Sequence, residues 1–289
     1  MVVSKARLWS ENSYHVLAWS LTYMISATPR RRSWNWNWTM TGNFTFTEVF
    51  TALGDLLMPR ECIVCGRILT LRESHICIDC LADLPRTFFS NMPHNQMADR
   101  FNSLIQRDLD ATGGFEEYSR ATSLFFYRSQ TGYRLITQRL KYHHDYQAGR
   151  YFAAMLGRDM SASSLYSDVD AVIPVPLHWT RRWSRGHNQA EIIAEILARS
   201  LKAELRSDIL SRPHRTRTQT KLSVKDKTRN VAGAFQVNRL KNVTEYSHIL
   251  LVDDVFTTGA TLHACHRALR AVFPPHVRIS VATLACVGI

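Results

Sequence analysis

The sequence predicts an α/β protein in which helices cover both faces of a parallel β-sheet, preceded by a small module built on four cysteines. Three observations predict it. From residue 115 onward, short apolar runs alternate with helix-length amphipathic segments, as in parallel sheets that are buried on both faces. Two Cys-x-x-Cys pairs stand close together between residues 62 and 80. An apolar run at 249–252 leads into two aspartates and a loop rich in threonine and glycine.

The composition is typical of a folded globular protein, since 45% of the 289 residues are hydrophobic and 21% are charged. The net charge of +12 favours phosphorylated partners, such as nucleotides, pyrophosphate or a nucleic-acid backbone, without choosing among them. No apolar stretch is long enough to span a membrane. The six cysteines show no disulfide framework spread along the chain, so we expect a reducing, cytoplasmic location.

Composition divides the chain into four expected parts. They are a disordered or misassigned leader at 1–47, a zinc-ribbon-like module at 48–84, a linker at 85–114 and the α/β domain at 115–289. The leader stands apart because five of the seven tryptophans lie in its first forty residues. We interpret it as a disordered extension, or as translation from a start codon upstream of the real one. A signal peptide is the less favoured alternative, because the downstream motifs need cytosolic metabolites and reduced thiols.

Five segments are expected as strands, because apolar residues run together between helical segments. In order, they lie at 123–127, 171–175, 234–237, 249–252 and 278–284. The second runs into a turn at Pro176, and the third follows a basic loop. Because helices separate most of them, we expect the strands to run parallel.

Five further segments are expected as helices from the spacing of their apolar residues. In order, they lie at 48–58, 133–141, 148–160, 189–201 and 260–272. The first leads into Pro59 and the cysteine pairs. The strongest is 189–201, where Ile193, Ile196 and Leu197 recur at helical spacing. Asn188 or Gln189 is well placed to cap it.

The cysteine pairs predict a structural metal site. Eleven residues separate Cys62-x-x-Cys65 from Cys77-x-x-Cys80, and two such pairs can place four thiolates around one tetrahedral Zn²⁺. The region is too small to form a core of its own, so metal binding would supply its folding energy. A redox dithiol pair is the less favoured alternative, because one Cys-x-x-Cys unit would suffice and neither opens a thioredoxin-like βαβ unit.

The segment at 249–261, ILLVDDVFTTGAT, predicts a sugar-phosphate site. Asp253 and Asp254 follow the apolar run, at the end of the strand where parallel α/β proteins bind ligands. Their carboxylates can accept hydrogen bonds from two neighbouring ribose hydroxyls. The loop that follows can offer backbone N–H groups and hydroxyls to a phosphate at the start of a helix, from Thr257, Thr258, Gly259, Ala260 and Thr261. The alternative is a buried strand followed by a capped helix, with the aspartates as solvated caps.

This thirteen-residue pattern resembles the motif with which type I phosphoribosyltransferases bind phosphoribosyl pyrophosphate. Three further segments lie at 140–153 (LKYHHDYQAGRYFA), 172–194 and 212–235. Together with the cysteine pairs, they resemble the ComF family of competence-related proteins, also called GntX-type DNA-utilisation proteins. The resemblance covers the chain from about residue 50 onward. It departs from the family at His187, where an aromatic residue such as Phe is usual.

The resemblance implies a type I phosphoribosyltransferase-like fold and roles for further residues. Asp253 and Asp254 would be catalytic, positioning the ribose, and Mg²⁺ would accompany phosphoribosyl pyrophosphate. Arg181 and Arg185 follow the strand end where related enzymes hold pyrophosphate. Arg215 and Gln219 lie in a basic, turn-rich segment that reads as a loop closing over the ligand, or else as a solvated charge run. Lys141 ends a helix, and interaction with the helix dipole would explain it without any function.

Two functions follow from these patterns. The first is a phosphoribosyltransferase that passes the phosphoribosyl group to a nitrogen nucleophile and releases pyrophosphate, with a role in DNA uptake or utilisation. The alternative is a non-catalytic factor that binds single-stranded DNA or senses nucleotides in competence, using the same fold. Single-stranded DNA and other competence or DNA-processing proteins are the further partners that the resemblance implies. No segment of the sequence identifies the acceptor base or the oligomeric state.

Overall fold

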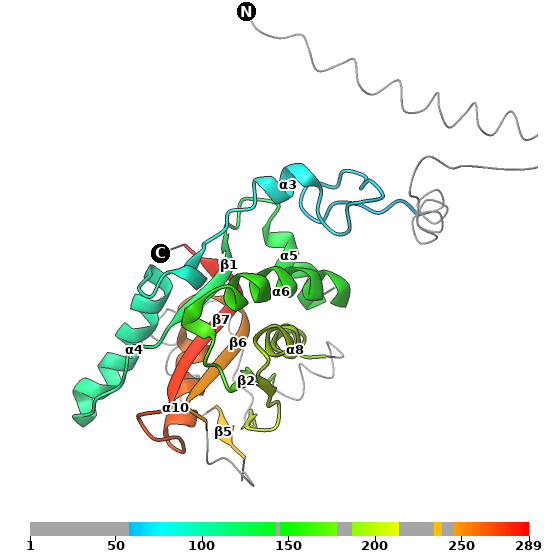
Figure 1. Ribbon diagram of the computed structural model, residues 1–289. Coiled ribbons are helices and arrows are strands. Elements are labelled where there is room, and N and C mark those ends of the chain that lie inside the picture. The colour runs from blue at the N-terminus through cyan, green and yellow to red at the C-terminus, as the bar shows by residue number, and fades with distance from the viewer. Residues whose placement is uncertain (1–57, 143–144, 178–186, 214–233, 239–245, 289) are drawn as a thin grey trace, which may run out of the picture. The chain divides into compact units, whose positions relative to one another are not determined.

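The computed structural model describes residues 58–142, 145–177, 187–213, 234–238 and 246–288 (Figure 1). All of them belong to one compact unit, Thr47–Ile289. The expected leader and nearly all of the expected helix at 48–58 lie outside the described residues. Within the described ranges, no helix is both long and apolar enough to cross a membrane.

The core of this unit is a parallel sheet of five strands in the order β1-β7-β6-β2-β3 (Figure 1). The strands are β1 (Ala121–Tyr127), β2 (Ala171–Pro174), β3 (Glu204–Leu205), β6 (His248–Phe256) and β7 (Arg278–Val287). Each pair of neighbours runs parallel. The prediction of a parallel sheet is therefore confirmed.

The expected strand at 234–237 lies outside this sheet. β5 (Gln236–Val237) pairs antiparallel with β4 (Leu210–Ser211) in a separate two-stranded ribbon. Ala234 and Phe235, just before β5, are buried in the core. The apolar residues at this position therefore pack against the core, while the backbone after them pairs with β4.

Helices cover both faces of the sheet, as predicted. On one face lie α5 (Arg134–Tyr142), α6 (Tyr146–Ser161) and α8 (Gln189–Leu201), and on the other lie α4 (Gln96–Thr112) and α10 (Ala260–Arg270). Alternate side chains of the central strand β6 pack against the helices on opposite faces of the sheet. Leu250 and Val252 pack in the first cluster, whereas Ile249 and Leu251 pack in the second. All four are fully buried, as a strand covered on both faces requires.

Segment 85–114, expected as a linker, holds the short 3-10 helix η1 (Phe89–Asn91) and the 17-residue helix α4. Met97, Ala98 and Phe101 of α4 have no exposed surface. Asn95 caps the helix by accepting hydrogen bonds from the N–H groups of Met97 and Ala98. Proline and asparagine before the helix gave the segment the composition of a linker, although the residues after them have helical apolar spacing.

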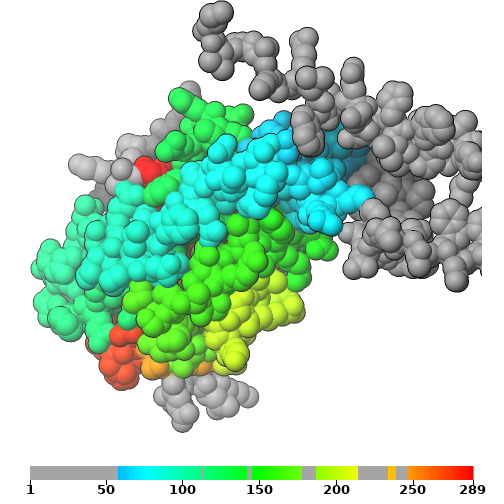
Figure 2. Space-filling model, turned by 45° about the horizontal axis from the view of Figure 1, so that its top comes forward, coloured from blue at the N-terminus to red at the C-terminus, as the bar shows by residue number. Residues whose placement is uncertain are grey.

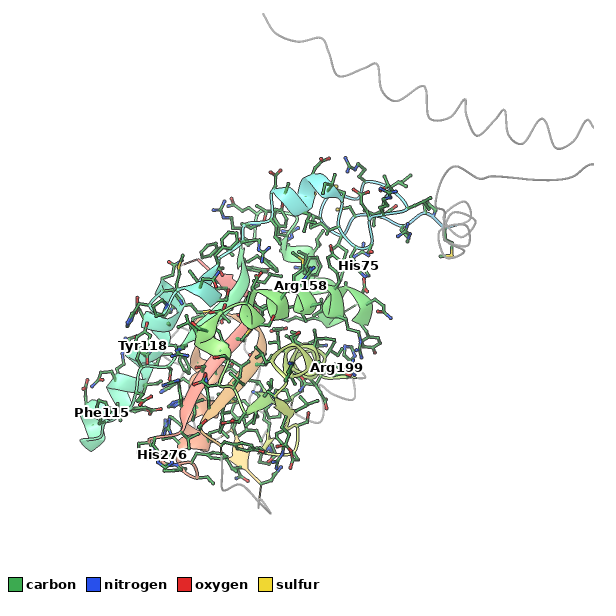
Figure 3. All side chains as sticks on the ribbon, in the orientation of Figure 1. His75, Phe115, Tyr118, Arg158, Arg199 and His276 are labelled. Atoms are coloured by element: carbon green, nitrogen blue, oxygen red, sulfur yellow. The ribbon has the colours of Figure 1, made fainter. Side chains whose placement is uncertain are left out.

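The cysteine module, which ends in the short helix α3 (Ile78–Ala82), packs on the face that carries α5 and α6. Cys62 and Cys77 belong to the same buried cluster as Phe152 of α6. Figure 2 shows the N-terminal described segment lying along the segments that hold α5 and α6. His75, labelled in Figure 3, contacts Tyr151 of α6 with ring centroids 5.4 Å apart.

Candidate functional site

The two predicted aspartates lie within β6 rather than after it. Pairing of β6 with β2 ends at Val252, whereas pairing with β7 continues to Phe256. The strand was expected to end at residue 252, but it continues to Phe256, so this prediction is wrong. Residue 252 is only the point where pairing with β2 ends. Asp253 and Asp254 belong to the last part of β6, at the carboxyl end of the sheet. In this part, β2 no longer pairs with β6. Ligands bind at this end in open parallel sheets.

The loop after β6 turns tightly into α10. Gly259 is the N-cap residue, with a φ of 80°, a left-handed conformation that favours glycine. A Cβ atom at this position would lie 2.9 Å from the Phe256 ring and 3.0 Å from Leu104. Glycine is thus favoured by packing as well as by backbone conformation. Because Gly259 has no capping side chain, the first turn of α10 presents backbone N–H groups at a helix N-terminus, which stabilises anions.

The residues predicted to bind a phosphate come together at this turn. One concave surface is lined by Asp253, Thr257, Gly259, Ala260 and Thr261. The Thr257 side chain is exposed, whereas the Thr258 hydroxyl accepts a hydrogen bond from the N–H of Ala260 at 3.4 Å. The arrangement has the backbone donors and hydroxyls that a phosphate needs. The role of each residue in binding stays a prediction.

The ionised form of the Asp253 carboxyl is disfavoured in the folded protein. Burial and the neighbouring charge of Asp254 raise the pKa of Asp253 to about 7. The N–H of Asp254, which donates to Asp253 Oδ1 at 2.8 Å, and the charges of Lys141 and Arg212 oppose this rise. A carboxyl with a perturbed pKa at the carboxyl end of a sheet is typical of a functional site.

Lys141 is a site residue that the sequence did not reveal. Its Nζ atom lies 2.8 Å from Asp254 Oδ2, and both side chains are partly buried, with exposed fractions of 26% and 14%. The helix dipole, which could explain Lys141 without any function, is therefore not its only electrostatic interaction. Its place in the segment 140–153 was the available signal. Arg212, which directly follows β4, is the second cation close enough to affect Asp253.

Four residues predicted to contact pyrophosphate or to close over it lie outside the described residues. They are Arg181, Arg185, Arg215 and Gln219. Their roles stay predictions. Arg212 shows that the described start of the loop segment at 212–235 already places positive charge near the aspartates.

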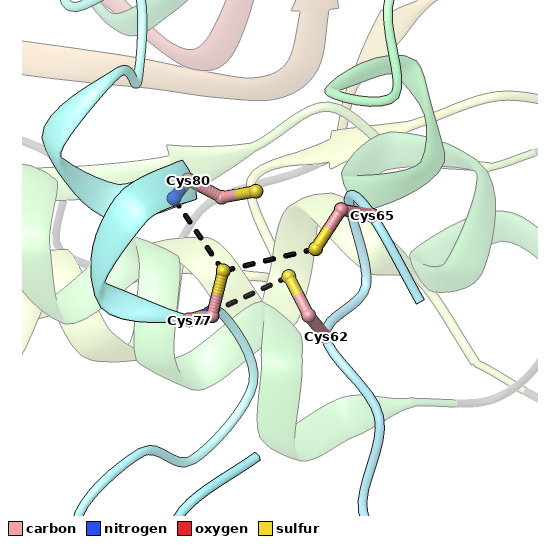
Figure 4. A group of neighbouring side chains, drawn as sticks. All are labelled: Cys62, Cys65, Cys77 and Cys80. Carbon is pink, nitrogen blue, oxygen red and sulfur yellow. Dashed lines mark hydrogen bonds between the residues drawn. The ribbon is translucent and has the colours of Figure 1, made fainter. Parts of the chain in front are cut away.

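The four cysteines come together as the sequence predicts. The Sγ atoms of Cys62, Cys65, Cys77 and Cys80 all lie within 4.8 Å of one another (Figure 4). The Sγ atoms of Cys65 and Cys77 are 3.7 Å apart. Tetrahedral zinc with Zn–S bonds of about 2.3 Å requires sulfurs about 3.8 Å apart. The cluster could therefore hold a zinc ion with little rearrangement.

Hydrogen bonds and charge also suit this cluster to a cation. Burial raises the pKa of Cys62, but N–H groups led by that of Cys77, which lies 3.4 Å from Cys62 Sγ, lower it to about 7 overall. Burial and the neighbouring sulfurs raise the pKa of Cys80. Four ionised thiolates this close would repel one another, so a divalent cation is the natural counter-charge.

Comparisons with known proteins agree with this geometry. Residues 187–285 match the phosphoribosyl transferase domain, and the match includes the aspartates and the loop after β6. Competence protein F of Haemophilus influenzae is 34% identical over 148 residues, which are 50% of this chain and 65% of that protein. The match thus spans less than two thirds of that relative. The chain is therefore similar to the phosphoribosyl transferase domain over residues 187–285 and to Competence protein F over half of its length, in agreement with the resemblance that the sequence predicts.

Proposed function

We propose that this protein binds phosphoribosyl pyrophosphate with Mg²⁺ at the aspartate pair and the loop 253–261, and acts as a ComF-like phosphoribosyltransferase in DNA uptake or utilisation. The observation that carries the proposal is the juxtaposition of Asp253 and Asp254 with the N-terminus of α10, at the carboxyl end of the central strand. The domain match over residues 187–285 supports a ligand of this type.

The sugar and the phosphate would use different parts of the site. Asp253 and Asp254 would accept hydrogen bonds from the two ribose hydroxyls. The 5-phosphate would lie over the turn formed by Thr257 to Thr261, where Gly259 removes the Cβ atom and the helix N-terminus supplies donors. Mg²⁺, when bound with the ligand, would neutralise part of the pyrophosphate charge beside Asp253 and Asp254 and would take few direct protein ligands.

In the reaction, the bond from the sugar to pyrophosphate breaks as a nitrogen nucleophile bonds to the same carbon. The transition state would resemble an oxocarbenium ion, as in glycosyl transfer generally. Held carboxylates beside the ribose would stabilise its positive charge. We assign departing pyrophosphate to Arg181 and Arg185, with Arg215 and Gln219 on a loop that closes over it.

We further propose that the four cysteines hold a structural Zn²⁺, that the module spans 48–84 and the phosphoribosyltransferase-like domain 115–289, and that the protein works in the cytoplasm. Sulfur geometry supports the zinc assignment. One zinc per chain, measured by metal analysis of anaerobically purified protein, is the expected result.

Calorimetry with phosphoribosyl pyrophosphate and Mg²⁺ tests the main proposal. Wild-type protein should bind one ligand per chain, and the double variant Asp253→Ala, Asp254→Ala should not bind. An exposed aspartate on α4 offers a matched control, so Asp110→Ala should bind as the wild type does. Undiminished binding by the double variant would remove the aspartates from the site.

A second candidate function is non-catalytic binding of single-stranded DNA, or nucleotide sensing, in competence. The similarity to Competence protein F of Haemophilus influenzae and the net charge of +12 favour it. Backbone binding releases counterions and should weaken steeply with salt. Fluorescence anisotropy with a labelled single strand at two salt concentrations separates the two candidates. Absence of salt-sensitive binding would rule out the DNA-binding form, whereas pyrophosphate release with a nucleobase would establish the enzyme.

A further inference from the structure

Helix α5 joins the cysteine module to the candidate ligand site. We infer that Lys141 is a positioning residue for Asp254 and that the module sets its place, through contacts at the other end of α5. This inference rests on the proposed function and adds a residue and a structural link to it.

The start of α5 lies against both cysteine pairs. Gly132, two residues before the helix, packs so closely on Val64 that a Cβ atom would lie 2.2 Å from the Val64 carbonyl oxygen. Val64 lies between Cys62 and Cys65. The hydroxyl of Tyr133 donates a hydrogen bond to the carbonyl oxygen of Cys80 at 2.9 Å. One pair therefore contacts Gly132 and the other contacts Tyr133.

A metal ion held by all four cysteines would fix the two pairs relative to each other, and with them the start of α5. The contact between module and helix is thus close, and it combines apolar packing with the hydrogen bond from Tyr133.

The body of α5 can transmit this position. The helix has nine residues and a length of about 13 Å. Ile136 and Leu140 are buried, with exposed fractions of 0% and 2%, and fix the rotation of the helix against the core. A displacement at Gly132 would therefore move the far end of the helix, because packed helices shift as rigid elements.

The far end of α5 carries Lys141 to Asp254, at 2.8 Å. The charged groups around the neighbouring Asp253 are Asp254 on β6, Lys141 on α5 and Arg212 after β4, and the Cys265 thiol of α10 also lies near it. Lys141 makes a direct ion pair with the second aspartate of the pair, Asp254. It holds Asp254 in one rotamer and lowers the electrostatic cost of two adjacent carboxylates.

Substitution of Lys141 tests the ligand end of the link. Lys141→Met keeps the aliphatic stem and removes the ammonium. We expect it to weaken binding of phosphoribosyl pyrophosphate about 10-fold and to raise the pKa of Asp253, measured by NMR titration of its carboxyl carbon in ligand-free protein. Lys141→Arg should restore most of both properties. Unchanged affinity and an unchanged titration in the methionine variant would overturn the inference.

Substitution of Gly132 tests the module end without touching a cysteine or the ligand site. Gly132→Ala should weaken binding about 5-fold and raise the pKa of Asp253, with the metal content unchanged. Gly288→Ala is the matched control, since a Cβ atom there has no atom within 4 Å. In the Lys141→Met background, Gly132→Ala should have no further effect on either measurement.

Fully additive effects of the two substitutions, or a normal Asp253 titration in folded Gly132→Ala protein, would contradict the link. If Gly132→Ala does not fold, Tyr133→Phe replaces it, because this change removes one hydrogen bond and keeps the ring. Wild-type protein that binds no phosphoribosyl pyrophosphate would refute the proposed function. The NMR titrations, which need no ligand, would still decide whether α5 links the module to Asp254.

Discussion

Replacing Asp253 with asparagine should stabilise the protein at alkaline pH. The pKa of Asp253 is raised to about 7 by burial and by the charge of Asp254, whereas an aspartate in an unfolded chain has a pKa of about 3.9. Between these values, the folded protein keeps a proton that the unfolded chain has lost. The associated stability is fully present below about pH 4 and is lost as the pH rises through about 7.

The size of the effect follows from this difference. A pKa raised from about 3.9 to about 7 corresponds to about 4 kcal/mol of folding free energy at pH 8. Asp253 as a residue is only partly buried, so this figure is an upper limit and we expect about 2 kcal/mol. Asparagine keeps an oxygen that can accept the hydrogen bond from the Asp254 N–H. For a chain of this size, the gain corresponds to a rise in Tm of about 4 to 8 °C.

Thermal and urea unfolding of Asp253→Asn at pH 8 and pH 4 provide the assay. The gain should be present at pH 8 and absent at pH 4, where wild-type Asp253 is protonated in the folded state. Asp110→Asn, at an exposed position on α4, should change neither value. Asparagine that destabilises the protein at pH 8, or a gain of equal size at both pH values, would refute the reasoning. The same variant should bind phosphoribosyl pyrophosphate poorly, which would show that the site costs stability.

Three further predictions concern the rest of the fold. His248 is fully buried between Asp168 and Ser280, and burial lowers its pKa, so the unfolded chain takes up the proton first. The free energy of unfolding should therefore fall as the pH drops below about 6.5. In urea unfolding at several pH values, this dependence on pH should be weaker for His248→Gln. Phe101→Ala should cost about 3 to 5 kcal/mol in chemical unfolding, since a linker residue would cost almost nothing. Cys77→Ser should abolish zinc loading and expose the module to limited proteolysis before the sheet domain, and full loading of this variant would exclude the four-cysteine site.

Features that local sequence determines were predicted best. α8 begins and ends at the expected residues because its apolar spacing and the cap at Asn188 are both local. The cysteine cluster was found for the same reason, since pairing within each Cys-x-x-Cys unit brings two sulfurs together whatever surrounds them. The aspartates and the loop through Gly259 could be read because a strand, a turn and a helix follow one another directly.

Features that depend on distant partners were missed. β6 extends through the aspartates because β7 pairs with it to Phe256, and β7 lies later in the sequence. The strand expected at 234–237 joined β4 instead of the sheet for a similar reason. Lys141 has no local signal that could identify Asp254 as its partner, since the contact forms only when α5 packs over the sheet. The helix dipole is a sufficient local explanation for a basic residue at a helix end. The sequence alone therefore gives no reason to expect a tertiary ion pair as well.

The charges at the candidate site constrain how a polyanion could bind there. Although the net charge of the chain is +12, the described side chains around the turn include two aspartates, opposed by Lys141 and Arg212. When both aspartates are ionised, these four described charges balance, so the described side chains do not form a basic patch, and the donors of α10 and its preceding loop would contribute much of the attraction for the 5-phosphate. A pyrophosphate group would then approach two carboxylates at a cost, unless a divalent cation accompanies it. On the proposed function, binding measured without Mg²⁺ should therefore be far weaker than with it, and the difference should shrink in Asp254→Asn, where one of the opposing charges is gone.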